Sequence, residues 1–160
     1  LKSKYKPCSL VTASETEALT GEKVTKSAAL DIPYKKDATN DHDGVISTCG
    51  HSFTPVLGLK MVVSTVPVTP EGKAKGEAKA KAAVEMTKKK FGAKIEEKKF
   101  GAITCSTYEM SGGMATFSGT SCGAEKGSLF FALSVTKGPK GFVPMDKLHA
   151  VAVKAMSRMP

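Results

Sequence analysis

Four cysteines are the residues of this chain with the clearest chemistry: Cys8, Cys49, Cys105 and Cys122. None of them belongs to a C-x-x-C pair, and only His51 follows one of them closely, two residues after Cys49. An even number of widely spaced cysteines indicates structural disulfides, which persist in oxidising compartments. The chain also opens at Leu1 without a charged or apolar leader, as a secreted chain does after removal of its signal peptide. We therefore expect an extracytoplasmic protein, whether periplasmic, attached to the cell surface or secreted.

An acidic segment, Asp-Ala-Thr-Asn-Asp-His-Asp-Gly at residues 37–44, contains oxygen ligands of the kind that calcium prefers. Its spacing does not match a calcium loop of the EF-hand type, since the first and twelfth positions would be Thr39 and Gly50. Asn, Asp and Gly are also the residues that tolerate tight turns. We interpret the segment as a polar hairpin loop without a metal.

Three histidines, His42, His51 and His149, and seven methionines raise the possibility of a copper site. The methionines are scattered, and three of them, Met145, Met156 and Met159, fit the pattern of a helix face that fills gaps in a core. We expect no metal and no cofactor.

Serine and cysteine near residues 118–123, Ser-Gly-Thr-Ser-Cys-Gly, are the nearest approach to a nucleophile loop. The pattern lacks G-x-S-x-G and is expected in a strand before a hairpin, where a nucleophile elbow between strand and helix cannot form. Cys122 is expected in a disulfide, and the Glu96-Glu97 pair is followed by two lysines and is typical of a solvated surface. We expect no enzymatic activity.

Lysines gather between Glu71 and Gly101, where ten Lys against five Glu supply +5 of the formal net charge of +9. A solvated helix is one interpretation, because Glu77–Lys81 and Glu85–Lys89 have the i, i+4 spacing of helix-supporting pairs. The other is contact with an anionic partner, such as an acidic protein or a cell-surface polymer. Aromatic residues are sparse here and arginine is absent, so we expect no specific recognition of nucleic acid. The candidate anion-contact residues are Lys73, Lys75, Lys79, Lys81, Lys88, Lys89 and Lys90.

The length of 160 residues suits a single domain, residues 1–160, with a hydrophobic core. No apolar run reaches the ~18 residues that a membrane span needs. The longest, residues 57–68, is interrupted by Lys60, so we expect no transmembrane segment.

Three helices are predicted by their end signals and apolar spacing. Residues 13–20 follow a Thr12–Glu15 capping box and end at Gly21. A long helix starts after Thr69, has Pro70 in its first turn and ends at Gly92. Its expected core-facing residues are Ala80, Ala83, Val84, Thr87 and Phe91. A last helix starts near Pro144, with Leu148, Val151, Ala152, Ala155 and Met159 on one face.

Strands are predicted between these helices. Residues 28–35 alternate as a half-buried edge strand, residues 45–53 alternate with Cys49, His51 and Phe53 on one face, and residues 57–66 are apolar enough for a central strand. The second half gives residues 94–97, 102–109, 114–122 and 128–136, with a turn at 124–127. We summarise the order as α-βββ-α-βββ-α, an α+β fold whose antiparallel sheet carries helices on one face. The layout loosely resembles the Mog1/PsbP-like class.

The opening Pro-Cys-Ser-Leu-Val-Thr at residues 7–12, followed by Glu, Leu19 and Gly21, resembles small secreted bacterial proteins and lipoproteins of unknown function. In them a second cysteine follows some tens of residues later, before an aromatic, as Cys49 precedes Phe53 here. The resemblance implies an extracytoplasmic α+β domain and assigns no catalytic residue. Tyr5-Lys6-Pro7 departs from a lipobox, so we do not expect a lipid on Cys8.

Four cysteines allow three pairings. We expect Cys8–Cys49, which ties the first helix to a strand, and Cys105–Cys122, which joins neighbouring antiparallel strands. The expected function is that of a non-catalytic binding or interaction module. The alternatives are a structural subunit of an extracellular assembly or filament, which would self-associate, and a weak binder of anionic surfaces through the lysine-rich helix.

Overall fold

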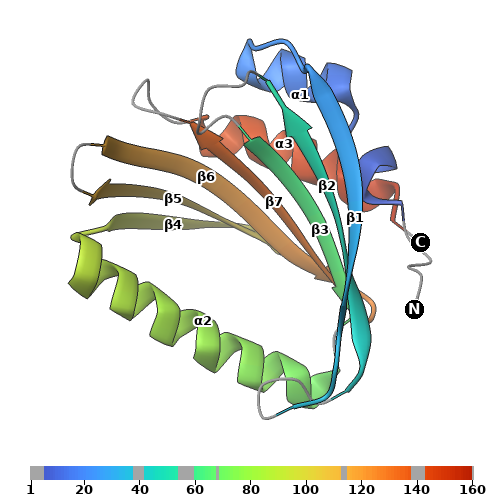
Figure 1. Ribbon diagram of the computed structural model, residues 1–160, viewed down its shortest axis with the longest axis vertical. Helices are drawn as coiled ribbons and strands as arrows, with labels where there is room; N and C mark the ends of the chain where they lie inside the picture. Colours follow the sequence, from blue (N-terminus) through green and yellow to red (C-terminus); the bar gives the residue numbers. More distant parts are fainter. Residues whose placement is uncertain are drawn as a thin grey trace.

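One antiparallel sheet of seven strands organises the residues that a computed structural model describes, 6–37, 42–53, 60–67, 69–112, 115–137 and 143–159 (Figure 1). The spatial order is β1-β2-β3-β7-β6-β5-β4, so that β3 and β7 join the two halves of the chain at the centre. The strands are β1 (Lys26–Tyr34), β2 (Gly44–Ser52), β3 (Lys60–Pro67), β4 (Lys94–Phe100), β5 (Ile103–Gly112), β6 (Ala115–Lys126) and β7 (Leu129–Lys137). The helices are the 3-10 helix η1 (Pro7–Ser9), α1 (Ala13–Thr20), α2 (Pro70–Phe91) and α3 (Met145–Ser157). The α+β class with an antiparallel sheet is therefore confirmed.

The helix ends lie where the local signals predict them. The Thr12 hydroxyl accepts the N–H of Glu15 at 3.2 Å, and the Glu15 carboxylate accepts the N–H of Thr12 at 3.0 Å, which completes a capping box for α1. Gly21 ends α1 and Gly92 ends α2, both with the positive φ that glycine adopts without a steric cost. Thr69 caps α2 through the N–H of Gly72 at 3.1 Å. These contacts join residues close in sequence, which is why sequence alone predicts them.

A single core lies on one face of the sheet. Alternate residues of β5, β6 and β7 point into it, and η1, α1 and α3 cover it. Leu148, Ala152 and Ala155 of α3 are fully buried against these strands, as the predicted stripe requires. Both disulfides lie on this side: Cys8 is bonded to Cys49 and Cys105 to Cys122, which confirms the expected pairing. The core residues from the strands are Cys49, Ile103, Cys105, Cys122, Ala124, Leu129, Phe131, Leu133 and Val135.

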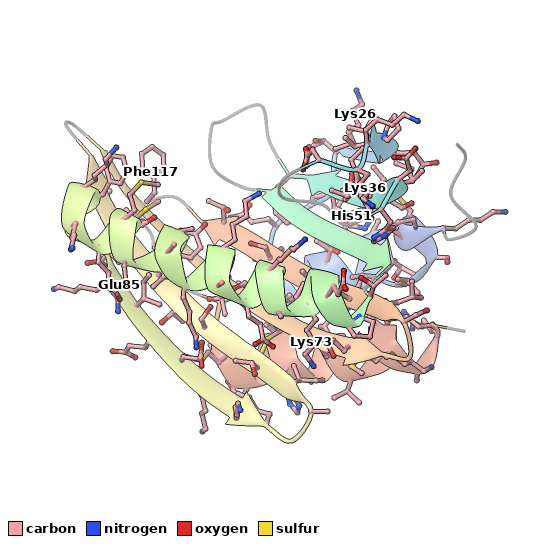
Figure 2. The ribbon with its side chains drawn as sticks, turned by 90° about the horizontal axis from the view of Figure 1, so that it is seen from below. Lys26, Lys36, His51, Lys73, Glu85 and Phe117 are labelled. Atoms are coloured by element: carbon pink, nitrogen blue, oxygen red, sulfur yellow. A yellow bond between two sulfur atoms is a disulfide. The ribbon has the colours of Figure 1, made fainter. Side chains whose placement is uncertain are left out.

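Helix α2 lies across the opposite face, which differs from the expectation that all helices cover one side. Glu125 of β6 follows the buried Ala124 and so points away from the core, and the Nζ of Lys73 in α2 lies 2.8 Å from its carboxylate. Figure 1 shows α1 and α3 together and α2 apart from them, and Figure 2 shows α2 crossing in front of the strands. The helix connects β3, near the centre of the sheet, to β4 at the far edge.

Three details of the strand predictions are also corrected. Four strands follow α2, as the four predicted segments indicate and unlike the three of the summarised order, and β4 extends to Phe100 and pairs with β5 along its whole length. Residues 124–126 of the expected turn 124–127 lie inside β6, which continues to Lys126, and the chain turns at Gly127. Strand β1 is an edge strand as predicted, but residues 26–33 are exposed on both faces rather than half-buried. Strand β3 is central, as predicted, while residues 57–59 of that prediction lie outside the described residues.

None of the helices in the described part of the chain has the length and apolar character needed to cross a membrane.

Candidate functional site

The lysine-rich helix α2 is the strongest candidate for a functional surface. It contains 22 residues, of which seven are Lys and three are Glu, and none is buried. An ion pair of Lys73 with Glu125 at 2.8 Å attaches its first turns to the sheet face, and the helix also contacts β5. The hydrogen bond with that carboxylate raises the pKa of Lys73 and holds the first turns of α2 against β6. Lys73 is therefore engaged within the fold, although it was expected at the contact surface.

The apolar stripe that was expected to face a core does face the sheet, but it is not buried. Ala80, Val84 and Phe91 follow Lys73 by 7, 11 and 18 residues, so they lie on the same side of the helix as the lysine that reaches Glu125. Val84 nevertheless remains 36% exposed and Phe91 51% exposed. On the sheet, Phe117 and Phe130 are also exposed at 41% and 37%. The helix thus contributes none of its side chains to the core.

The outer side of α2 carries a row of lysines, which we call the outer lysine row: Lys75, Lys79 and Lys90, with Met86 between the last two. Spacings of four, seven and four residues bring the four side chains onto one side of a helix with about 3.6 residues per turn. Glu77 and Glu85 do not share that spacing. All four side chains are exposed, and within the described residues the three lysines have no ion-pair partner.

The remaining predicted lysines flank this row. Lys81 and Lys89 are exposed, and Lys88 lies 3.4 Å from the carboxylate of Glu85, three residues earlier. The predicted i, i+4 pairing of Glu85 with Lys89 is thus replaced by an i, i+3 contact. Such exposed pairs contribute a few tenths of a kcal/mol to a helix, about 0.2–0.5. The helix consequently presents most of its positive charge to solvent (Figure 2).

His51 has a structural position in the core. Its Nε2 lies 2.8 Å from the carbonyl oxygen of Val11, which can only accept, so Nε2 carries the hydrogen. Its Nδ1 accepts the hydroxyl of Ser27 at 2.8 Å. The ring is 1% exposed and also lies beside the Sγ of Cys49, at 3.7 Å. One nitrogen joins the segment between η1 and α1 to β2, and the other joins β1 to β2, which leaves neither for a metal ion.

The other two histidines lie far from each other in the fold. His42 contacts the Tyr34 hydroxyl through Nε2 at 3.0 Å, at the turn between β1 and β2. In the same turn, Asp43 accepts the Nζ of Lys35 at 2.7 Å, and this hydrogen bond lowers the pKa of Asp43. His149 of α3 stacks on Phe100 of β4, with ring centroids 4.6 Å apart. The acidic segment 37–44 is described only in part, since residues 38–41 lie outside the described residues.

The hydroxyls of the serine-rich segment 118–123 have structural partners. Thr120 is buried and donates to the carbonyl oxygen of Val143 at 2.6 Å. Ser121 and Ser106 share a hydrogen bond of 2.9 Å between β5 and β6, and Cys122 is in a disulfide. The segment is a strand, as its sequence predicts. Its side chains join elements of the fold.

Among the residues that the structure describes, no group of three or more His, Cys, Asp or Glu side chains could hold a metal ion. The sequence analysis did not identify two residues that matter for this surface, Glu125 of β6 and Met86 of α2. Glu125 was not expected to hold α2, because its partner lies 52 positions away. Met86 was not predicted either, although its spacing from Lys79 and Lys90 in the sequence places it on the same side of a helix as those lysines.

A scan of the chain against models of protein families finds no match, and searches among curated proteins and solved structures also find none.

Proposed function

We propose that the protein is a non-catalytic extracytoplasmic binding module that contacts an acidic cell-surface polymer through the outer side of α2. The observation that carries this proposal is the exposure of the whole helix: 22 residues with complete caps and no buried side chain. Most helices in proteins gain their stability from packing an apolar face. A helix that packs so little and carries seven lysines is better explained by a contact outside the fold.

The outer lysine row fits an extended partner with repeated negative charges. Fifteen residues separate Lys75 from Lys90, which corresponds to about 22 Å along the helix axis. Lysine acts as a mobile point charge, whereas bidentate recognition of one defined anion favours arginine. The chain has a single arginine, Arg158, and that side chain is bound to Glu15. The contact would therefore be electrostatic and salt-sensitive, with Met86 adding an apolar contact at the centre of the row.

The compartment and the lack of catalysis rest on separate observations. Two disulfides, each closed within one half of the chain, suit an oxidising compartment outside the cytoplasm. The hydroxyls of Thr120, Ser121 and Ser106 are engaged in hydrogen bonds that join strands and loops. Those engagements favour a binding role over nucleophilic chemistry.

Retention on a polyanion matrix tests the proposal. The variant Lys75→Gln/Lys79→Gln/Lys90→Gln removes the outer lysine row, while Lys23→Gln/Lys147→Gln/Lys154→Gln removes the same charge from exposed positions elsewhere. We expect the first variant to elute from polyglutamate or dextran sulfate at clearly lower salt than the second, since attraction depends on local charge within a Debye length of about 8 Å at 0.15 M. If the two variants elute at the same salt concentration, retention depends only on net charge, and the proposal is refuted.

A structural subunit of an extracellular assembly is the second candidate. A different observation favours it, the exposed edge strand β1, whose residues 26–33 have no cover on either face.

A further inference from the structure

The two edges of the sheet differ in how they are protected against pairing with another strand. Edge strands expose unpaired backbone N–H and C=O groups, and proteins usually guard them with charged residues. In β4, five of the seven residues are charged. In β1, only Lys26 and Asp31 are charged among nine residues, and the stretch between them is Ser-Ala-Ala-Leu. Strand β1 is therefore the less guarded edge of this sheet, although it contains Pro33 near its end.

Strand β1 also exposes apolar side chains on one face. Ser27 binds the buried His51, so the odd-numbered residues face the core side and the even-numbered ones the α2 side. On the α2 side Leu30 is 59% and Ile32 43% exposed, which makes Leu30 the most exposed of the large apolar side chains described. A further strand paired with this edge would cover part of these exposed apolar side chains.

The geometry points to a second copy of this chain as that further strand, paired antiparallel through β1 of each copy. A two-fold axis perpendicular to the sheet keeps the two faces matched, so residues of equal parity oppose each other. The nine residues overlap completely when Leu30 faces Leu30 of the second copy. Ala28 then opposes Ile32, Ala29 opposes Asp31 and Lys26 opposes Tyr34, so no like charges meet. Pro33 removes one N–H donor per copy, near the end of the ladder.

The charge of the edge strand itself does not select an acidic protein over a second copy. The chain carries +9 overall, but Lys26 and Asp31 cancel within β1, so the edge itself does not select an acidic strand. A second copy offers a strand of the same length and twist, with an apolar row that continues the first. The inference stands independently of α2, whose lysines lie outside this edge.

Sedimentation equilibrium from about 1 μM to about 1 mM measures the association directly. We expect a monomer–dimer equilibrium that strengthens with added salt, because the repulsion between two +9 chains is screened. Leu30→Lys places two lysines opposite each other and should raise the dissociation constant about tenfold or more. At concentrations where the wild type is also monomeric, its melting temperature should be unchanged, since Leu30 is exposed. Val153→Lys, at a residue of α3 that is 47% exposed, is the matched control and should leave dimerisation intact.

Mixing provides a test of the register. Leu30→Asp alone should dimerise as weakly as Leu30→Lys, but an equimolar mixture of the two should form heterodimers more strongly than either variant alone self-associates, because opposite charges then meet across the axis. A wild-type protein that stays monomeric over the whole range overturns the inference, as does a Leu30→Lys variant that dimerises as strongly as the wild type. Equal loss of dimer in Val153→Lys would also overturn it, since the association would then run through another surface.

Discussion

Arg158 holds Glu15 with two nitrogen atoms, its Nη1 and Nη2 each 2.7 Å from one oxygen of the carboxylate. The same carboxylate accepts the N–H of Thr12 at 3.0 Å, so one side chain both caps α1 and binds the residue that follows α3. Nη1 also donates to the carbonyl of Leu10 at 2.8 Å. The hydrogen bond with Arg158 is the largest cause that lowers the pKa of Glu15, to about 2.

Arg158→Lys should destabilise the protein, because an ammonium cannot reproduce two parallel hydrogen bonds to one carboxylate. We expect a loss of about 1 kcal/mol in the free energy of unfolding, the upper range for a pair that is partly exposed. Urea unfolding at neutral pH measures it. Lys154→Arg, a change of the same kind on the exposed side of α3, serves as control and should be neutral.

The Glu15–Arg158 pair should lose its contribution in acid. The pKa of Glu15 is lowered from 4.5 to about 2 in the folded state, so the folded protein binds this proton less readily than the unfolded chain. The stabilisation is then complete above the unfolded pKa and disappears as the pH falls through about 2. The difference in stability between wild type and Glu15→Gln should be constant above about pH 5.5 and shrink steadily below it. A difference that grows in acid would contradict the assignment.

His51→Phe should be destabilising, because it leaves the carbonyl of the buried Val11 without its hydrogen-bond donor, whereas the exposed Ser27 hydroxyl can turn to solvent. An unsatisfied buried polar group costs about 1–3 kcal/mol, so we expect a loss in that range. His149→Phe keeps a ring stacked on Phe100 and should change stability much less. If a chelator lowers the melting temperature of the wild type, the structural role of His51 would have to be revised.

Each disulfide should contribute separately to stability. Cys105 and Cys122 oppose each other in the β5–β6 register, and their bond closes 17 residues, while Cys8–Cys49 closes 41. In the chain-entropy model, the paired alanine variants should lose about 3 and about 4 kcal/mol respectively. Denaturant unfolding measures the losses, and non-reduced peptide maps check the pairing. A peptide that links Cys49 to Cys105 would show a different connectivity.

Helix α2 should open more readily than the strands behind it. Its amides lie in a helix with no buried side chain, whereas Phe131, Leu133 and Val135 of β7 are fully buried. We expect amide hydrogen exchange in α2 to be about tenfold or more faster than in β7, since local opening does not require disruption of the core. Equal protection of the two elements would mean that α2 unfolds only with the whole domain.

The parts of the fold that sequence predicts are those fixed by neighbours in the chain. The Thr12–Glu15 box, the glycine ends of α1 and α2, and the cysteine pairing all follow from local chemistry or from elements already placed. The turn after β6 was misplaced because Ala124-Glu125-Lys126 has little strand propensity. Strand β6 continues there because each residue finds a partner in β7, a tertiary effect that overrides propensity.

The candidate site was predicted in composition but not in geometry. The sequence identifies the lysines of α2. It does not show that Lys73 binds Glu125 while other lysines form an outer row, because this depends on which side of the helix meets the sheet. That choice depends on contacts such as Lys73 with Glu125, whose residues lie 52 positions apart. Arg158 and Glu15 are 143 residues apart and leave no local signal at all.

Helix α2 lies between the two disulfide-closed loops in the sequence, so cleavage within it can separate the chain into two fragments. One disulfide closes before the helix and the other after it, so a protease that cuts after any exposed lysine of α2 leaves two pieces without a covalent link. The two pieces remain held together by the antiparallel pairing of β3 with β7 and by the ion pair of Arg158 with Glu15. The nicked protein should therefore migrate as one species in native buffer and as two in denaturant without reductant. Two halves of the chain that are produced separately should therefore be able to associate through the pairing of β3 with β7.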